Sequence, residues 1–515
     1  MSAKRMNPKM SVPKGATFVF CLAIACFAVA VNCARTFSSG REPRIETLRD
    51  LLELHELGQL SGLGDAAIPD KVDLDAGSAL RRLENLLRDG ELKQTPRAKL
   101  AFDGRLRTGE VLVGDEGGTK AAAADPTFEG KYPIIFIPGL MGSQIEVRLN
   151  GREDPPNWFC RRTNKNWSRL WMIDTMHMLP ELASCWLQDM DLTWNATSKT
   201  LDPSVPGIDS RATPGWDGAM KLDDKSPTLQ PLADFLTTSL GYEAGRDMVA
   251  QSYDWRAGPE TWMRPGNVYD QMKALIEKTV DSRPDREPIV AWSISLGGPF
   301  FSLFLSKHVT EAWKQEYIHA FFSVSGVMSG SVIAPYVSLA GTRFFQAPSW
   351  LKTALDGVAQ SVSSVPWVFP HADAFGDAAI ISTPERNYTA KDLGNVLDAV
   401  GNKQQGDLYR ENLDLYGLRC LLPNVTTYCV TGYGVPTPET ILYDENDLKG
   451  AQPTNMTMTS GDNCVPVASL RVYDDFGLHQ KAPVFPYHMF NKTHAGLMYD
   501  PDVVSLFLGV ITDVV

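Results

Sequence analysis

A serine placed between an apolar strand and an apolar helix constrains this chain more than any other feature. Residues 288–292 form a short apolar run with a β-branched centre, and an apolar helical pattern begins shortly after it. The intervening residues are Ser293-Ile294-Ser295-Leu296-Gly297-Gly298. A strand that turns directly into a helix needs small side chains two positions before and after the turn, which Ser293 and Gly297 supply. The pattern predicts a nucleophile elbow with Ser295 at its tip.

The surrounding chain predicts the fold. At 515 residues it is long enough for one large domain with insertions, or for two ordinary domains. Short strand-like runs alternate with helical patterns from Tyr132 onward, at 133–137, 288–292, 319–324 and 427–430. This alternation is typical of βαβ units. We therefore expect an α/β-hydrolase fold, with a mainly parallel sheet and with lid and cap insertions.

The order of the chemical groups supports a catalytic role for Ser295. A serine hydroxyl is a weak nucleophile until a histidine accepts its proton and a carboxylate orients that histidine. In α/β-hydrolases the order along the chain is nucleophile, acid, histidine, and here Asp462 and His494 follow Ser295. We predict these three residues as a triad, with His479 and His488 as competing bases.

Each triad residue also has an ordinary interpretation. An S-x-S-x-G sequence is a weak signal, because a helix N-cap serine gives the same letters. Asp462 alone would be a turn residue, and His494 alone a solvated loop histidine. The strand, the helix and the chain order together favour catalysis.

An oxyanion hole needs two backbone amides, one after the nucleophile and one in the loop after an early strand. Leu296 follows Ser295, and the loop from Pro138 to Ser143 follows the run that ends at Ile137. We therefore predict the amides of Leu140 and Leu296 as donors. A plain turn at the strand end is the alternative for the loop.

The amino-terminal region resembles a targeting segment. Basic residues at Lys4, Arg5, Lys9 and Lys14 precede an apolar run at 16–31. We interpret residues 1–34 as a signal peptide or an uncleaved signal anchor, and 35–130 as a charged extension such as a propeptide. The catalytic domain is then 131–515. Six N-x-S/T sequons agree with the secretory pathway, for a secreted or lumenal protein: Asn166, Asn195, Asn387, Asn424, Asn455 and Asn491.

The net charge and the spacing of the cysteines limit which partners and ligands this chain is expected to bind. The net charge of −12 and a pI near 5.3 disfavour nucleic acid. Five cysteines follow the targeting segment, an odd number, so at least one is free or pairs between chains. They are Cys160, Cys185, Cys420, Cys429 and Cys464. None has zinc-ligand spacing, so we expect no metal and no cofactor, and disulfides remain open.

Further stretches resemble one known family. They are Ile137-Pro138-Gly139 with Gly142-Ser143-Gln144-Ile145-Glu146, Tyr253-Asp254-Trp255-Arg256, Asn387-Tyr388-Thr389 and Tyr433-Gly434-Val435-Pro436-Thr437-Pro438. From Tyr132 to the carboxyl terminus the chain resembles the lecithin:cholesterol acyltransferase family, which includes lysosomal phospholipase A2 and the phospholipid:diacylglycerol acyltransferases. In the second stretch, Asp254 and Arg256 are also suited simply to pair and pin a loop.

The resemblance implies a disulfide-closed lid at about 158–186 that meets a membrane or lipoprotein-like surface. Cys160 and Cys185 would close it. Its lipid-contacting aromatic residues would be Trp158, Trp167 and Trp171, with Met172 and Trp186 nearby. A buried aromatic cluster is the alternative.

The resemblance also implies an activity. Ser295 would attack a phospholipid acyl ester, and the acyl-enzyme would pass its chain to a lipid hydroxyl, such as that of a sterol or diacylglycerol, or to water. Departures from the family pattern lie at Ser293 and Ile294, where glycine and histidine are usual, and at Asn463-Cys464 in the acid motif. The alternatives are a lipid-binding or transfer protein on a hydrolase scaffold, and an esterase for small soluble substrates.

Overall fold

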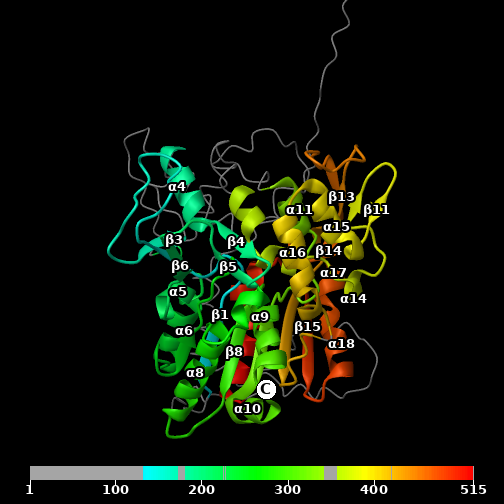
Figure 1. Cartoon of the computed structure of the whole chain (residues 1–515). Helices are drawn as coiled ribbons and strands as arrows, with labels where there is room; N and C mark the ends of the chain where they lie inside the picture. Colours follow the sequence, from blue (N-terminus) through cyan, green and yellow to red (C-terminus); the bar gives the residue numbers. More distant parts are fainter. Residues whose placement is uncertain are drawn as a thin grey trace, which may run out of the picture.

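A six-stranded parallel sheet forms the centre of the computed structural model, which describes residues 132–171, 180–223, 226, 228–341, 356–418 and 420–513 (Figure 1). The strand order is β15-β12-β9-β8-β1-β7, and every neighbouring pair is parallel. The strands are β1 (Ile134–Ile137), β7 (Met248–Ala250), β8 (Ile289–Ile294), β9 (Ile318–Val324), β12 (Thr427–Tyr433) and β15 (Val484–Phe490). The expected α/β-hydrolase fold with a mainly parallel sheet is confirmed.

Helices cover both faces of this sheet, which explains why its central strands β1, β8 and β9 are buried along almost their whole length. In β8 all six residues are buried. Val290 and Trp292 pack in the core beside α6 (Gln230–Leu240) and α19 (Pro501–Thr512). Ile289 and Ala291 face the other core, with α8 (Val268–Asp281) and α9 (Gly297–Leu303).

The first insertion lies between β1 and β7 and forms a small sheet of its own. Its order is β3-β2-β6, with antiparallel pairs. The elements are β2 (Ile145–Leu149), β3 (Ser168–Trp171), α4 (Pro180–Met190), the hairpin β4 (Leu192–Asn195) and β5 (Thr200–Pro203), β6 (Ile208–Ala212) and α5 (Trp216–Met220). In Figure 1, β3, β6 and α4 lie at the upper left, above α6.

Further insertions surround β12 and lie at the upper right of Figure 1. A four-stranded sheet has the order β11-β10-β13-β14. Its strands are β10 (Ile381–Ser382), β11 (Asn387–Tyr388), β13 (Val435–Leu442) and β14 (Asn455–Gly461). Five helices lie beside it: α11 (Ile333–Ala340), α13 (Ser364–Trp367), α14 (Ala372–Phe375), α15 (Leu393–Val400) and α16 (Lys403–Asn412).

Short helices complete the described part of the chain. They are α7 (Pro259–Trp262), α10 (Glu311–Tyr317), α17 (Val467–Leu470), α18 (Val472–His479), a π-helix at Phe304–His308, and 3-10 turns at Ala390–Asp392, Leu413–Leu415 and Gly496–Tyr499. Among the described residues, no helix combines the length and apolar character needed to cross a bilayer. The predicted segments at 1–34 and 35–130 lie outside the described residues.

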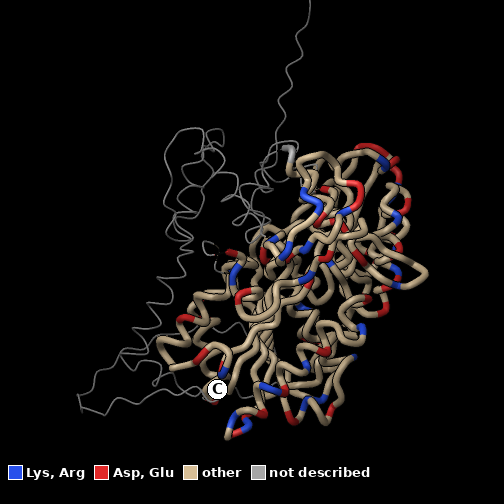
Figure 2. The backbone as a smooth tube through the Cα atoms, turned by 60° about the vertical axis from the view of Figure 1, so that its left-hand side comes forward, with Lys and Arg blue, Asp and Glu red and all other residues tan. Residues whose placement is uncertain are grey.

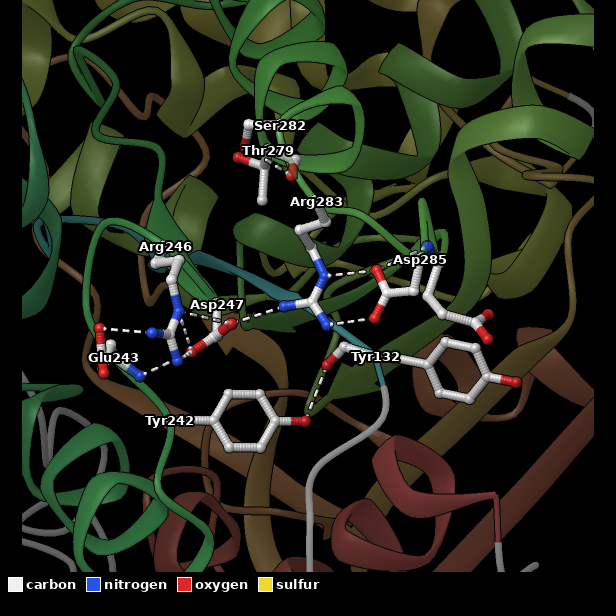
Figure 3. Close-up of polar contacts among 10 residues, drawn as sticks. Tyr132, Tyr242, Glu243, Arg246, Asp247, Thr279, Ser282, Arg283 and Asp285 are labelled. Atoms are coloured by element: carbon white, nitrogen blue, oxygen red, sulfur yellow. Dashed lines mark hydrogen bonds and ion pairs between the residues drawn. The ribbon is translucent and has the colours of Figure 1, made fainter.

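An ionic network ties together the amino ends of β1 and β7 and the connection after α8 (Figure 3). Arg283 contacts Asp247 at 2.5 Å and Asp285 at 3.0 Å, and Arg246 contacts Asp247 at 2.8 Å. The Tyr242 hydroxyl donates to the Tyr132 carbonyl at 2.7 Å. Elsewhere, acidic and basic residues are interspersed over the outside of the described chain (Figure 2).

Candidate active site

Ser295 occupies the sharp turn between β8 and α9. Its φ is 56°, a left-handed value that costs a non-glycine residue of the order of 1 kcal/mol. The Ser295 amide donates to the carbonyl of Val324, at the end of β9, at 3.0 Å. A Cβ on Gly297 would lie 2.7 Å from the carbonyl oxygens of Ile137 and Pro138, so only glycine fits there. The predicted strand–turn–helix arrangement is therefore present.

The two unusual residues before Ser295 are accommodated by the sheet. Ser293 is fully buried in β8, opposite Ile137 in β1 and Ser323 in β9. Its hydroxyl has no hydrogen-bond partner among the described residues. Ile294 is 2% exposed and packs in the core. A serine in place of the usual glycine thus leaves the elbow intact.

The carboxylate of Asp462 lies directly against the ring of His494. Asp462 Oδ2 is 2.7 Å from His494 Nδ1. The second oxygen, Oδ1, accepts from the amides of Cys464 at 3.0 Å and Val465 at 2.7 Å. Asp462 is fully buried, so these bonds fix the carboxylate and, through it, the orientation of the imidazole.

Three of the four polar groups of His494 are held by neighbours. Nδ1 contacts Asp462, the amide donates to the Asp462 carbonyl at 2.7 Å, and the carbonyl accepts from the Ser325 hydroxyl at 3.0 Å. The fourth, Nε2, is buried and has no partner among the described residues. Ser325 directly follows Val324, whose carbonyl accepts from the Ser295 amide. His494 therefore lies at the carboxyl ends of the parallel strands, as Ser295 does.

The competing histidines have other surroundings. His488 lies in β15, with Nδ1 2.7 Å from the Thr431 hydroxyl and Nε2 2.8 Å from Asp474. His479 is the last residue of α18. Neither is joined to Asp462, whereas His494 is.

Three aromatic side chains hold the loop between Pro138 and Ser143. The Tyr253 hydroxyl donates to the Pro138 carbonyl at 2.9 Å, and burial keeps the Tyr253 pKa well above its usual value, so the donor stays protonated. Trp171 Nε1 donates to the Met141 carbonyl at 2.9 Å, and Trp255 Nε1 to the Ser143 carbonyl at 3.1 Å. The positions of these donors could not be read from the sequence, although two of them belong to the Tyr253–Arg256 stretch.

This loop approaches the elbow closely. A Cβ on Gly139 would lie 2.9 Å from Ser295 Cβ, so glycine is required for the approach. The Leu140 and Leu296 amides donate no hydrogen bond to a described residue. Two unpaired amides beside a nucleophile suit the oxygen of a tetrahedral intermediate.

The expected lid residues differ in exposure. Trp158 is 84% exposed and stacks on Phe159, which is 46% exposed. Trp167 is half-buried between the guanidinium groups of Arg148 and Arg211, at 4.9 and 4.1 Å. Trp171 is 2% exposed, because its ring packs on Trp255 and its N–H binds the loop, so for this residue an exposed lid position is wrong. Met172 lies outside the described residues.

The cysteines of the described part of the chain form one disulfide and three thiols. Cys160 and Cys185 form the expected disulfide, while Cys420, Cys429 and Cys464 are not disulfide-bonded. Burial raises the pKa of the Cys429 thiol well above its usual value.

The Asp254–Arg256 pair lies next to the loop that Tyr253 and Trp255 hold. Arg256 pairs with Asp254 at 2.6 Å and donates to the Met190 carbonyl and the Ser210 hydroxyl. This pair pins a loop, which is the structural interpretation of that motif.

The sequence is similar to those of known lipid acyltransferases. Residues 166–418 match the family model described as lecithin:cholesterol acyltransferase. The phosphatidylcholine-sterol acyltransferase of Gallus gallus is 28% identical over 398 residues, covering 75% of this chain and 92% of the relative. Over these residues the chain is similar to the lecithin:cholesterol acyltransferase family. The lysosomal phospholipase A and acyltransferase of Bos taurus is 27% identical over 332 residues, 62% of this chain and 78% of its own.

Solved structures resemble the chain only distantly in sequence. A chain of the Tle4–Tli4 complex aligns with a TM-score of 0.40 and 11% identity, covering 75% of this chain and 99% of that one. Within the sequence matches, Ser295 lies inside the range of the family model, whereas Asp462 and His494 lie beyond it. The proposal for these two residues therefore depends on their geometry.

Proposed function

We propose that this chain is a serine-dependent lipid acyltransferase or phospholipase that works through an acyl-enzyme. Ser295 is the nucleophile, His494 the base, and Asp462 orients His494. The observation that carries the proposal is the buried, unpartnered Nε2 of His494, whose other polar groups are all held. A buried nitrogen without a partner is costly unless it serves a reaction.

The proposed reaction follows from these positions. Ser295 Oγ attacks the carbonyl carbon of a phospholipid acyl ester as its proton passes to His494 Nε2. The Leu140 and Leu296 amides donate to the resulting oxyanion. The ester C–O bond then breaks, and His494 returns the proton to the departing lysophospholipid. In the second half, a lipid hydroxyl or water attacks the acyl carbon as its proton passes to His494, the bond between the acyl carbon and Ser295 Oγ breaks, and His494 returns the proton to Ser295 Oγ.

The lipid nature of the substrate is supported by the relatives and by the disulfide loop. Phosphatidylcholine-sterol acyltransferase and lysosomal phospholipase A and acyltransferase are names that point to phospholipid donors and to sterol, other lipid alcohols or water as acceptors. Trp158 and Phe159 present exposed rings. Between Pro155 and Trp171 the chain carries four basic residues and no acidic one, in a protein of net charge −12. Such a loop suits a lipid surface.

We also propose a secretory location, with residues 1–34 as signal peptide or anchor, 35–130 as an extension and 131–515 as the catalytic domain with its lid around 158–186. The Cys160–Cys185 disulfide supports an oxidising compartment.

Mutation of the nucleophile tests the mechanism. Ser295→Ala is expected to lower fatty-acid release and acyl transfer from phospholipid vesicles by on the order of 10⁴-fold or more, with the thermal unfolding curve nearly unchanged. Ser302→Ala is the matched control, since Ser302 is a buried serine of α9 whose hydroxyl has no partner among the described residues. Retained turnover in Ser295→Ala would contradict the proposal.

Two further measurements distinguish the alternatives. A fluorophosphonate should label Ser295 in the wild type, whereas a catalytically impaired lipid-binding protein would stay unlabelled. Hydrolysis should rise sharply above the critical micelle concentration of the substrate, whereas an esterase for small soluble substrates would show no such rise. Labelled phospholipid supplied with sterol, diacylglycerol or neither then identifies the acceptor from the products.

A further inference from the structure

Ser325 holds a strained conformation directly beside the proposed triad. It follows the last residue of β9, is fully buried, and has a φ of 49°. Left-handed φ values disfavour any residue with a Cβ, and glycine would adopt this one without strain. A serine at such a position needs a compensating interaction from its hydroxyl.

The hydroxyl makes one contact, and that contact is with the proposed base. Ser325 Oγ donates to the His494 carbonyl at 3.0 Å, and the Ser325 amide donates to the Val430 carbonyl in β12 at 2.8 Å. The preceding residue, Val324, accepts from the Ser295 amide at 3.0 Å. Ser325 therefore lies between the turn that carries the nucleophile and the loop that carries the histidine, and it touches neither Ser295 Oγ nor His494 Nε2.

We infer that Ser325 is a positioning residue that holds the backbone of His494 in register with Ser295. The inference rests on the proposed function. Asp462 fixes the ring and the amide of His494, while the carbonyl has Ser325 as its donor. Without the hydroxyl, the loop after β15 loses one of its attachments to the central sheet. Small displacements of a base relative to its nucleophile reduce the rate steeply.

Two substitutions separate positioning from stability. Ser325→Ala removes the hydroxyl and keeps the strain, whereas Ser325→Gly removes both. The glycine variant is therefore expected to be at least as stable as the alanine variant in urea unfolding. Both variants are expected to lower kcat for acyl release by about tenfold, with little change in KM, and to slow fluorophosphonate labelling of Ser295 in parallel.

Thr279→Val is the matched control. Thr279 is a buried α8 residue whose hydroxyl donates to the Leu275 carbonyl at 2.8 Å, and it lies beside the Arg283 network (Figure 3). Its substitution should change stability and leave kcat unchanged.

The outcomes are distinct. A labelling rate and a kcat equal to those of the wild type in Ser325→Gly would overturn the inference. Losses of kcat that only follow the loss of folded protein in the two variants would overturn it too. If turnover instead survives Ser295→Ala, the proposed function itself fails. If turnover depends on Ser295 while both Ser325 variants remain fully active, only the positioning role is wrong.

Discussion

The hydroxyl of Ser293 is buried in β8 without a partner among the described residues, two positions before the proposed nucleophile. Burying an unbonded hydroxyl costs about 1–3 kcal/mol. Ser293→Ala removes that oxygen and leaves a side chain small enough for the elbow. We expect its free energy of unfolding to equal that of the wild type or to exceed it by up to about 1 kcal/mol, with turnover within about twofold. Urea unfolding and vesicle hydrolysis measure both.

Gly297→Ala provides the contrast on the other side of Ser295. The added Cβ would lie 2.7 Å from two carbonyl oxygens, so this variant should lose both stability and activity. A large loss of stability in Ser293→Ala would instead mean that the Ser293 hydroxyl has a bonding partner, such as a water molecule.

Residue identity alone did not predict how the aromatic side chains are used. Trp158 and Trp171 are the same residue type in one aromatic-rich part of the sequence, yet Trp158 is 84% exposed and Trp171 is 2% exposed. The difference arises from the fold, because β3 directs Trp171 toward the Met141 carbonyl and the ring of Trp255. Such a long-range contact has no local sequence signal.

The disulfide-closed segment is expected to affect both the stability of the protein and its proposed contact with lipid. Cys160 and Cys185 are separated by 25 residues, a loop length for which a disulfide contributes about 3 kcal/mol. The exposed Trp158–Phe159 pair lies directly before Cys160, and Trp171 within the segment donates to the Met141 carbonyl. Replacing both cysteines by serine should therefore lower hydrolysis of phospholipid vesicles more than hydrolysis of a soluble short-chain ester.

The control for this prediction is Cys420→Ser, because Cys420 is half-buried and not disulfide-bonded. It should leave the ratio of the two activities unchanged. Equal losses on vesicles and on the soluble ester in the double variant would mean that the disulfide supports only the catalytic fold.

The central strands were predictable from the sequence because each is apolar along its length. The expected run at 288–292 begins one residue before β8 (Ile289–Ile294), and the expected run at 319–324 lies wholly within β9 (Ile318–Val324). The edge strand β15 was missed, since it is partly exposed and contains Pro486. β13 contains Pro436 and Pro438, which are typical of turns, and its pairing with β14 is irregular at Pro438. Whether these segments form strands depends on the strands with which they pair, which lie far away in the sequence.

At the scale of the whole molecule, the ionic network in Figure 3 joins three parts of the chain. It lies at the amino ends of β1 and β7, whereas Ser295 follows the carboxyl end of β8. Burial by itself would raise the Asp247 pKa, but hydrogen bonds from Arg246 and the Glu243 amide and the charges of Arg246 and Arg283 lower it. A carboxyl whose folded pKa is lowered stabilises the protein above its unfolded pKa. That stability is lost as the pH falls through the folded pKa.

Arg283→Met tests this contribution. Arg283→Met removes one of the two cations that pair with Asp247, whose side chain is 11% exposed, and leaves Arg246 in place, so it should cost about 2 kcal/mol at pH 7. The deficit relative to the wild type should shrink as the pH falls below about 4, because protonated Asp247 no longer needs the cation. Urea unfolding between pH 7 and about pH 2 measures it, because the folded pKa of Asp247 lies below its usual value.

Arg286→Met is the control, since Arg286 is 51% exposed and its pairs with Asp281 and Glu316 lie in solvent. It should cost less than about 1 kcal/mol at any pH. Because the network lies at the opposite end of the parallel strands from Ser295, Arg283→Met should also leave kcat unchanged wherever the protein remains folded. A constant deficit from pH 7 to about pH 2 would mean that Arg283 stabilises the fold through its packing rather than through the charge of Asp247.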